Sequence, residues 1–171
     1  NHSWQSPDGE IIAGRGVWQG LSPSFKHNSR FASFVLIAKG SYQYELDIEY
    51  PFALVAQGES PDSPVHIIPA WWFMYDMFAI VRNKYKFSAR DKRIQKIQHI
   101  ETDPFAPDTM QEVEDAIDRL IDLTAENLSE LAPERAEKAD TPEKLRQAGK
   151  DFLHSKEAQS FTLHDNICQK K

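Results

Sequence analysis

Residues 1–68 alternate short apolar runs with glycine, proline and polar residues, which is the pattern of β-strands separated by turns. Between residues 42 and 48 every second residue is apolar, and the residues between them are Gln43, Glu45 and Asp47. A period of two is typical of a strand with one buried face. We therefore expect residues 1–68 to be rich in β-structure.

A second spacing runs through the same segment. Apolar residues recur at multiples of six positions, at Ile12, Trp18, Leu36, Tyr42, Ile48 and Leu54. A six-residue repeat with one inward apolar side chain per side is typical of a left-handed β-helix. The phase is lost at Ser24 and Arg30, so an ordinary antiparallel sheet remains the alternative.

The pattern changes to that of a helix after Pro69. Residues 70–81 are apolar except for Asp76, so a helix there would be buried nearly all round. Pro69 suits its first position, where the missing N–H costs nothing. Its aromatic side chains favour a core role over stacking on sugars or bases. Asp76 would then need a cationic partner, for which Arg82 or another basic residue nearby is the natural candidate.

An acidic amphipathic helix is predicted after the loop at 103–108. Asp108 or Thr109 can cap it, and Gln111 or Glu112 can complete a capping box. Its apolar residues form one narrow stripe, at Met110, Val113, Ile117, Leu120, Thr124, Leu128 and Leu131. Such a stripe predicts packing on another helix or on a partner chain.

Residues 134–160 predict a further helical region, in which Thr141 caps a new helix that starts at Pro142. Together these elements indicate an α+β chain. Residues 1–68 form its β-rich part, either the end of a left-handed β-helix or a small β-sheet. Residues 69–171 form its helical part.

The chain has 171 residues, 40% hydrophobic content and a single cysteine, Cys168. That length suits one domain or two small ones, and one cysteine excludes an internal disulfide framework or a cysteine-based zinc cage. No signal peptide or membrane-spanning run is visible, so we expect a cytoplasmic protein that does not enter membranes. The chain begins with Asn1, so we expect a piece of a longer protein or one whose start is not included.

The net charge of −6 is unevenly distributed along the chain. Residues 82–96 carry seven basic side chains and one acidic one, whereas residues 101–131 carry ten acidic and one basic. The two blocks predict pairing with each other or with a neighbouring subunit, or two solvated faces on a common core. A phosphate or nucleotide site in the basic block is the third alternative. Mild overall acidity gives no reason to expect nucleic-acid binding.

Two sets of residues are candidates for an anion site. His27 lies in a polar stretch before an apolar strand, and with Arg30 and Lys39 nearby it could act as a general base. The alternative is a surface or structural histidine. The candidate phosphate ligands of the basic block are Arg82, Lys84, Arg90, Lys92 and Arg93. No glycine-rich phosphate loop accompanies them.

His99, Glu101 and Asp103 alternate, so in an extended segment all three would point to one side. A histidine with two carboxylates can bind a divalent metal. Polar residues on a strand face are common, and nothing else in the sequence completes a ligand set. We therefore expect no metal site.

Several ordered motifs resemble a known family. They are 27–34 (HNSRFASF), 36–40 (LIAKG), 44–48 (YELDI), 51–55 (PFALV), 69–75 (PAWWFMY) and 90–93 (RDKR). Their order resembles an uncharacterised domain-of-unknown-function family of larger bacterial proteins, best known from Bacteroides-type genomes. Its members look like trimeric left-handed β-helix proteins of the hexapeptide acyltransferase class, with a helical C-terminal part. The resemblance covers roughly residues 20–110.

The resemblance implies that this chain is the end of a β-helix within a homotrimer. Hexapeptide acyltransferases generally use a histidine base, which activates a sugar hydroxyl or amine towards an acyl-CoA or acyl-carrier thioester. Acyl-CoA is thus the implied cofactor, and a sugar or nucleotide-sugar is the implied substrate. The candidate base is then His27, and the candidate substrate-binding residues are Arg30, Lys39, Arg82, Arg90, Lys92 and Arg93.

This chain departs from the acyltransferase class in having few intact hexapeptides, so we expect an incomplete intersubunit site. The competing hypothesis is a non-catalytic oligomerisation or protein-interaction module. It is motivated by the apolar stripe between Met110 and Leu131 and by the two opposed charge blocks.

Overall fold

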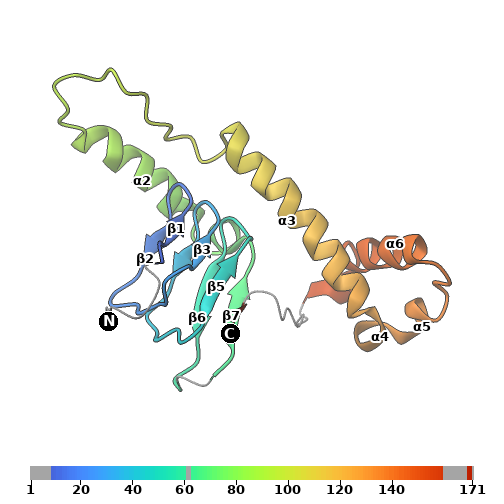
Figure 1. The fold of residues 1–171 in the computed structure, drawn as a ribbon. Coiled ribbons are helices and arrows are strands. Elements are labelled where there is room, and N and C mark those ends of the chain that lie inside the picture. Colours follow the sequence, from blue (N-terminus) through green and yellow to red (C-terminus); the bar gives the residue numbers. More distant parts are fainter. Residues whose placement is uncertain (1–8, 61–62, 160–168, 171) are drawn as a thin grey trace. The chain divides into compact units, whose positions relative to one another are not determined.

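The computed structural model describes residues 9–60, 63–159 and 169–170 (Figure 1). The strands are β1 (Ile12–Ala13), β2 (Trp18–Gln19), β3 (Arg30–Phe31), β4 (Leu36–Ile37), β5 (Glu45–Ile48), β6 (Leu54–Gln57), β7 (Val65–Ile68) and β8 (Gln169–Lys170). The helices are α1 (Trp71–Met74), α2 (Met77–Arg90), α3 (Pro107–Glu126), α4 (Leu128–Leu131), α5 (Pro133–Ala136) and α6 (Pro142–Leu153). The chain is α+β, with a β-rich N-terminal part followed by helices.

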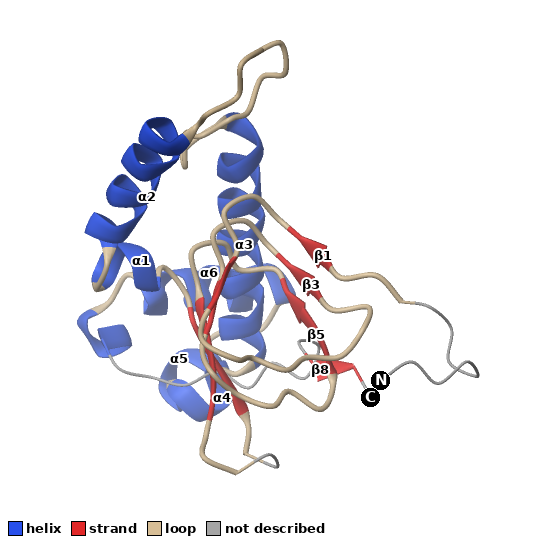
Figure 2. Cartoon of the chain, turned by 90° about the vertical axis from the view of Figure 1, so that its left-hand side faces the viewer, coloured by secondary structure: helices blue, strands red, loops and turns tan. Residues whose placement is uncertain are grey.

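Strands β1 to β6 form two parallel sets, β1–β3–β5 and β2–β4–β6 (Figure 2). In the second set Trp18 lies beside Leu36, and Leu36 lies beside Leu54, so the chain returns to the same place at every eighteenth position. In the first set Arg30 lies beside Asp47, so the spacing between these paired residues is one position shorter. We call β1–β6 the parallel stack. Its period is three times the six-residue spacing, and antiparallel pairing among the described strands is confined to β6–β7 and β5–β8.

The corners of the parallel stack repeat with the same period. Gly16, Phe34 and Phe52, each two residues before a strand of the second set, have positive φ angles of 72°, 59° and 58°. Positive φ is uncommon outside glycine, so its return at every eighteenth position marks an equivalent corner in each pass. At Gly16 glycine is also needed for space, since a Cβ would lie 2.5 Å from the Phe34 ring.

The six-residue phase places Tyr42 and Ile48 correctly in the core, but its prediction of inward side chains is wrong elsewhere. Leu36 and Leu54 are only half-buried, and Ile12 and Trp18 are exposed. The residues buried beside them are Val35, Ile37, Ala53 and Val55. Because neighbouring strand residues point to opposite faces, a stretch that is apolar on both faces hides which set is inward.

The outer face of the second set is apolar because helices pack on it. Leu36 packs there against a cluster of Phe52, Trp72, Ala79 and Ile80. This cluster connects the parallel stack to α1 and α2. A strand set covered on both sides needs apolar residues at consecutive positions, which is what the sequence has.

The prediction of one continuous buried helix over residues 70–81 is wrong. The chain forms α1 and α2 with a break at Tyr75 and Asp76, and Pro69 lies before Ala70, outside the helix. Only Trp72, Ala79 and Ile80 of this segment are buried. Asp76 is half-buried at the N-terminus of α2, where the helix dipole favours a carboxylate, and it forms no ion pair with Arg82.

Helix α3 begins at Pro107, and the expected continuous stripe up to Leu131 is interrupted at Asn127. Ile117 of that stripe is exposed, whereas Ile121 is buried. The prediction for the last long helix is confirmed. Thr141 caps α6 by accepting a hydrogen bond from the Lys144 amide at 3.3 Å, and Pro142 occupies the first position.

The described residues form two compact units, 9–113 with 169–170 and 114–159. In the second unit, Arg146 of α6 donates to Asp118 at 2.7 Å and to Asp122 at 2.6 Å. The acidic helix therefore finds a basic partner outside the basic block. Between the two blocks, Lys84 and Asp103 form an ion pair at 3.8 Å.

Candidate functional site

An open groove of about 860 Å³ lies in the first unit, and we call it the basic groove. Its lining residues are Trp18, Asn83, Lys86, Phe87, Arg90, Asp91, Lys92, Arg93 and Ile100. Asn83, Lys86, Phe87 and Arg90 are three or four positions apart, so they share one face of α2. Trp18 of β2 and residues of the loop after α2 complete the groove.

The apolar part of the basic groove is a set of partly exposed rings. Trp18 and Phe87 are each 39% exposed. Trp18 stacks on Trp72 with ring centroids 5.9 Å apart and planes 28° apart. Trp72 is itself fixed, because its Nε1–H donates to the Phe34 carbonyl oxygen at 2.5 Å. The groove therefore presents an indole surface that rests on a buried ring.

One carboxylate and four cations line the basic groove, but they are not equivalent. Arg93 donates from Nε and Nη2 to the two oxygens of Asp91, at 2.9 Å each, and from Nη1 to the Gln98 carbonyl at 3.1 Å. The hydrogen bonds from Arg93 hold the pKa of Asp91 well below its usual range. Arg93 thus fixes the loop after α2 and neutralises the carboxylate of the groove.

The remaining cations of the groove are Lys86, Arg90 and Lys92. Their side chains form no hydrogen bond or ion pair with the residues that the structure describes. Three cations without a carboxylate partner beside exposed rings make a site suited to an anion that carries a ring system.

The groove contains part of the predicted site. It brings together Arg90, Lys92 and Arg93, whereas Arg82 is exposed outside it. His27 lies in an exposed turn before β3, and Arg30 and Lys39 are exposed on other parts of the first unit. None of these three lines the basic groove.

Sequence reasoning missed Lys86, Phe87 and Trp18 as groove residues. The three-and-four spacing from Asn83 to Arg90 was visible and could have identified one helical face. Trp18 shares the six-residue phase, which predicts it inside the strand segment and not in a groove.

A second polar cluster joins a corner of the parallel stack to the start of α3. Arg15 donates from Nη2 to Asp108 at 2.7 Å and to the Thr109 hydroxyl at 2.5 Å, and from Nη1 to the Asp103 carbonyl. Its guanidinium lies over the Phe34 ring, 5.6 Å from the centroid. These contacts join the corner at Arg15 to the start of α3.

Glu112 belongs to the same cluster and does not complete the expected capping box. Its carboxylate accepts from the Ser33 amide at 2.7 Å and from the Ser33 hydroxyl at 3.0 Å. Ser33 is nearly fully buried, so this pairing satisfies polar groups that have no access to water. Asp108 and Thr109, the expected caps, bind Arg15 instead.

The alternating segment at 99–103 is occupied by its own contacts. His99 Nε2 lies 3.4 Å from Glu101, and Glu101 accepts the Asp103 amide at 2.7 Å. That backbone hydrogen bond, aided by His99, lowers the pKa of Glu101. Within the described ranges no group of histidine, cysteine and carboxylate side chains is arranged to hold a metal ion, and Cys168 lies outside those ranges.

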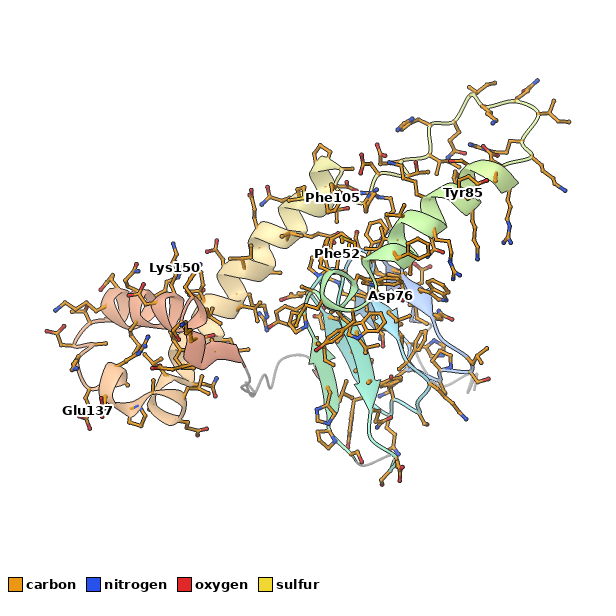
Figure 3. The ribbon with its side chains drawn as sticks, turned by 180° about the vertical axis from the view of Figure 1, so that it is seen from behind. Phe52, Asp76, Tyr85, Phe105, Glu137 and Lys150 are labelled. Atoms are coloured by element: carbon orange, nitrogen blue, oxygen red, sulfur yellow. The ribbon has the colours of Figure 1, made fainter. Side chains whose placement is uncertain are left out.

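The segment of α1 and α2 also carries an unusual exposed surface on its other side. Met74, Phe78, Val81 and Tyr85 are 64%, 76%, 61% and 73% exposed, and we call them the apolar stripe (Figure 3 labels Tyr85). Phe78, Val81 and Tyr85 are three and four positions apart, so they share one side of α2, whereas Met74 belongs to α1, before the break at Tyr75 and Asp76. The aromatic segment expected to be core is therefore core on one side and solvent-exposed on the other.

The chain is similar to an uncharacterised protein of Treponema pallidum (strain Nichols), a bacterial relative with 53% identity over 117 residues. The aligned segment is 68% of this chain but only 16% of the relative's length. No family model matches the chain, and no solved structure matches it. Within the described ranges, no helix has the length and apolar character needed to cross a membrane.

Proposed function

We propose that this chain is a non-catalytic assembly segment that associates with further copies of itself through the apolar stripe. The observation that carries this proposal is the exposure of Met74, Phe78, Val81 and Tyr85 on a helical segment whose opposite side is buried. Contiguous exposed apolar surface marks an interaction site. A helix that is apolar on its outer side as well as on its inner side needs a second partner to bury the outer side.

Charge favours a second copy as that partner. Outside the basic groove, helix α2 carries Arg82 and Lys84 and no acidic residue, whereas α3 carries seven acidic residues and one basic residue. Each copy therefore has both a basic apolar helix and an acidic helix. A basic surface meeting an acidic surface of another copy would orient the association. A homotrimer is the stoichiometry that the family resemblance implies.

The test is the mass of the chain in solution, measured by light scattering over a range of concentrations. We expect an oligomer for the natural sequence and a single-chain mass for a Phe78→Ser, Tyr85→Ser variant. Ile94→Ser is the matched control, because Ile94 is fully exposed but lies outside the stripe. Its mass should equal that of the natural sequence. A natural chain that stays monomeric throughout would contradict the proposal.

A second candidate function follows from the period of the parallel stack. Paired strands lie eighteen positions apart, which corresponds to three hexapeptides. This spacing supports the proposal that the chain is the end of a left-handed β-helix of the hexapeptide acyltransferase class. On this alternative, the longer protein transfers an acyl group from acyl-CoA to a sugar or nucleotide-sugar, with His27 as the base. Arg30 and Lys39 lie in the same β-rich part as His27 and would help to bind the substrate.

This alternative is tested in the longer protein with acyl-CoA donors and nucleotide-sugar acceptors. His27→Ala should abolish most of the rate, because the hydroxyl or amine would lose its base. His66→Ala is a matched control, since His66 is also exposed but lies on β7. An unchanged rate in His27→Ala removes this residue from the mechanism.

A further inference from the structure

We propose that the basic groove binds a nucleoside diphosphate group. Its base would stack on the exposed rings of Trp18 and Phe87, and its phosphates would contact Lys86, Arg90 and Lys92. Binding there does not require self-association, because the groove lies within one chain and its cations are not part of the apolar stripe. It also does not require His27, which lies outside the groove.

The phosphates are assigned to the cations by their charge and lack of partners. Lys86, Arg90 and Lys92 bind no carboxylate among the described residues, and Arg93 neutralises Asp91, the one carboxylate of the lining. Holding three cations near one another without an anion is electrostatically unfavourable. A group with two or more negative charges relieves that repulsion, and arginine also offers a fork of N–H donors that matches phosphate oxygens.

The base is assigned to the rings for a geometric reason. Trp18 and Phe87 come from different elements, a strand and a helix, yet both line the same groove with part of each ring exposed. The stacking of Trp18 on Trp72 fixes the orientation of its indole. A planar base can stack on such a surface, which a simple inorganic anion cannot use. The volume of about 860 Å³ is within the range of small-ligand sites.

Arg93 acts as a positioning residue in this arrangement. Its hydrogen bonds, to both oxygens of Asp91 and to the Gln98 carbonyl, set the path of the loop that carries Lys92. The ligand charge is therefore met by Lys86, Arg90 and Lys92, while the Arg93–Asp91 pair maintains the shape of the groove.

Calorimetric titration of the full chain at low ionic strength tests the proposal with three probes: ADP, adenosine and inorganic pyrophosphate. We expect saturable binding of ADP, with adenosine and pyrophosphate each at least about tenfold weaker because each lacks one half of the recognition. Raising the salt concentration should weaken ADP binding, since the phosphate contacts are exposed.

Variants locate the site. Arg90→Ala and Lys86→Ala should each weaken ADP binding about tenfold, in line with the loss of one charge-assisted contact. Trp18→Leu should weaken the binding of ADP but leave the binding of pyrophosphate unchanged. Leucine is chosen because the neighbouring residues of the same strand set, Leu36 and Leu54, are also leucines. Arg82→Ala is the matched control, because it removes the same charge from α2 outside the groove. Each variant is checked by circular dichroism for an unchanged fold.

Three results would overturn the proposal. The first is no saturable binding of ADP. The second is equal weakening by Arg82→Ala and Arg90→Ala, which would indicate non-specific attraction to a basic helix. The third is pyrophosphate binding as tight as ADP binding, which would indicate an anion site without recognition of the base.

Discussion

The rings of Phe34 and Phe52 stack almost in parallel, with centroids 5.0 Å apart and planes 4° apart. The two residues occupy the same corner of successive passes through the parallel stack, and both have positive φ, at 59° and 58°. The Phe52 ring also contacts Phe73, with ring centroids 4.7 Å apart, and Phe105, with ring centroids 6.3 Å apart. Figure 3 labels Phe52 and Phe105. One strained corner thus connects the strands to α1 and to the segment before α3.

Phe52→Ala should destabilise the first unit by about 3–5 kcal/mol, because Phe52 is buried and three rings lose their partner. Phe52→Gly should be no worse than Phe52→Ala. At an ordinary position glycine costs about 1 kcal/mol more than alanine, but glycine adopts positive φ without strain. Urea unfolding followed by tryptophan fluorescence measures both variants.

The control for this pair is Leu21→Ala, because Leu21 is 86% exposed and should change stability by less than about 0.5 kcal/mol. A glycine variant clearly less stable than the alanine variant would contradict the left-handed conformation of residue 52. Tryptophan emission is suited to this unit because Trp18, Trp71 and Trp72 all belong to it.

The sequence predicted the period of the parallel stack better than its inward face. The eighteen-position period is a multiple of the six-residue spacing. However, Leu36 is apolar because a helix covers it, whereas Ile37 is apolar because it lies in the core. Periodicity alone does not distinguish these two kinds of burial. The cap at Thr141 was predictable because it depends only on neighbouring residues.

Arg15→Ala should destabilise the first unit by about 2 kcal/mol, since it removes charge-assisted hydrogen bonds to Asp108 and Thr109 and packing over Phe34. Urea unfolding measures the loss, and Lys39→Ala is the control, because Lys39 is exposed. Arg15→Lys should recover only part of the loss, since a lysine cannot reproduce the planar fork that reaches several acceptors. Full stability in Arg15→Ala would contradict a structural role for the cluster.

Gly149→Ala should destabilise the second unit by about 1 kcal/mol. A Cβ at this position would lie 3.0 Å from the Ala125 amide and 3.1 Å from the Ile121 carbonyl, and backbone atoms of a packed helix yield little. Crowding of this kind costs about 1–3 kcal/mol and outweighs the gain of about 1 kcal/mol in helix propensity. Thermal melts by circular dichroism should show no comparable loss for Gln147→Ala, at an exposed position of the same helix.

The bond between Asp91 and Arg93 predicts a dependence on pH. Because the pKa of Asp91 is lowered in the folded chain, this carboxylate contributes stability above its unfolded pKa of about 3.9. That contribution is lost as pH falls towards the lower folded value. Carbon NMR titration should find the Asp91 midpoint below about 3.9 and, in Arg93→Ala, closer to that value. Equal midpoints in the two chains would contradict the role given to Arg93.

The candidate site was only partly predictable. The basic block identified Arg90, Lys92 and Arg93, because charge density is visible in the sequence. Arg93 pairs with Asp91, whereas Lys86 and Arg90 do not. This difference of role depends on side-chain geometry, which the sequence does not show. Arg15 and Asp108 are far apart in the sequence, and no local pattern links them. Because Asp108 pairs with Arg15, the prediction that Asp108 caps α3 is wrong.

The central claim, self-association through the apolar stripe, is tested most directly by photo-cross-linking from defined positions. A photoreactive phenylalanine analogue replaces Phe78 in one sample and Ile94 in another, and both positions are exposed. The account predicts a covalent product between two copies from position 78 and little or none from position 94. A single-chain product from position 78, or equal cross-linking from the two positions, would contradict it.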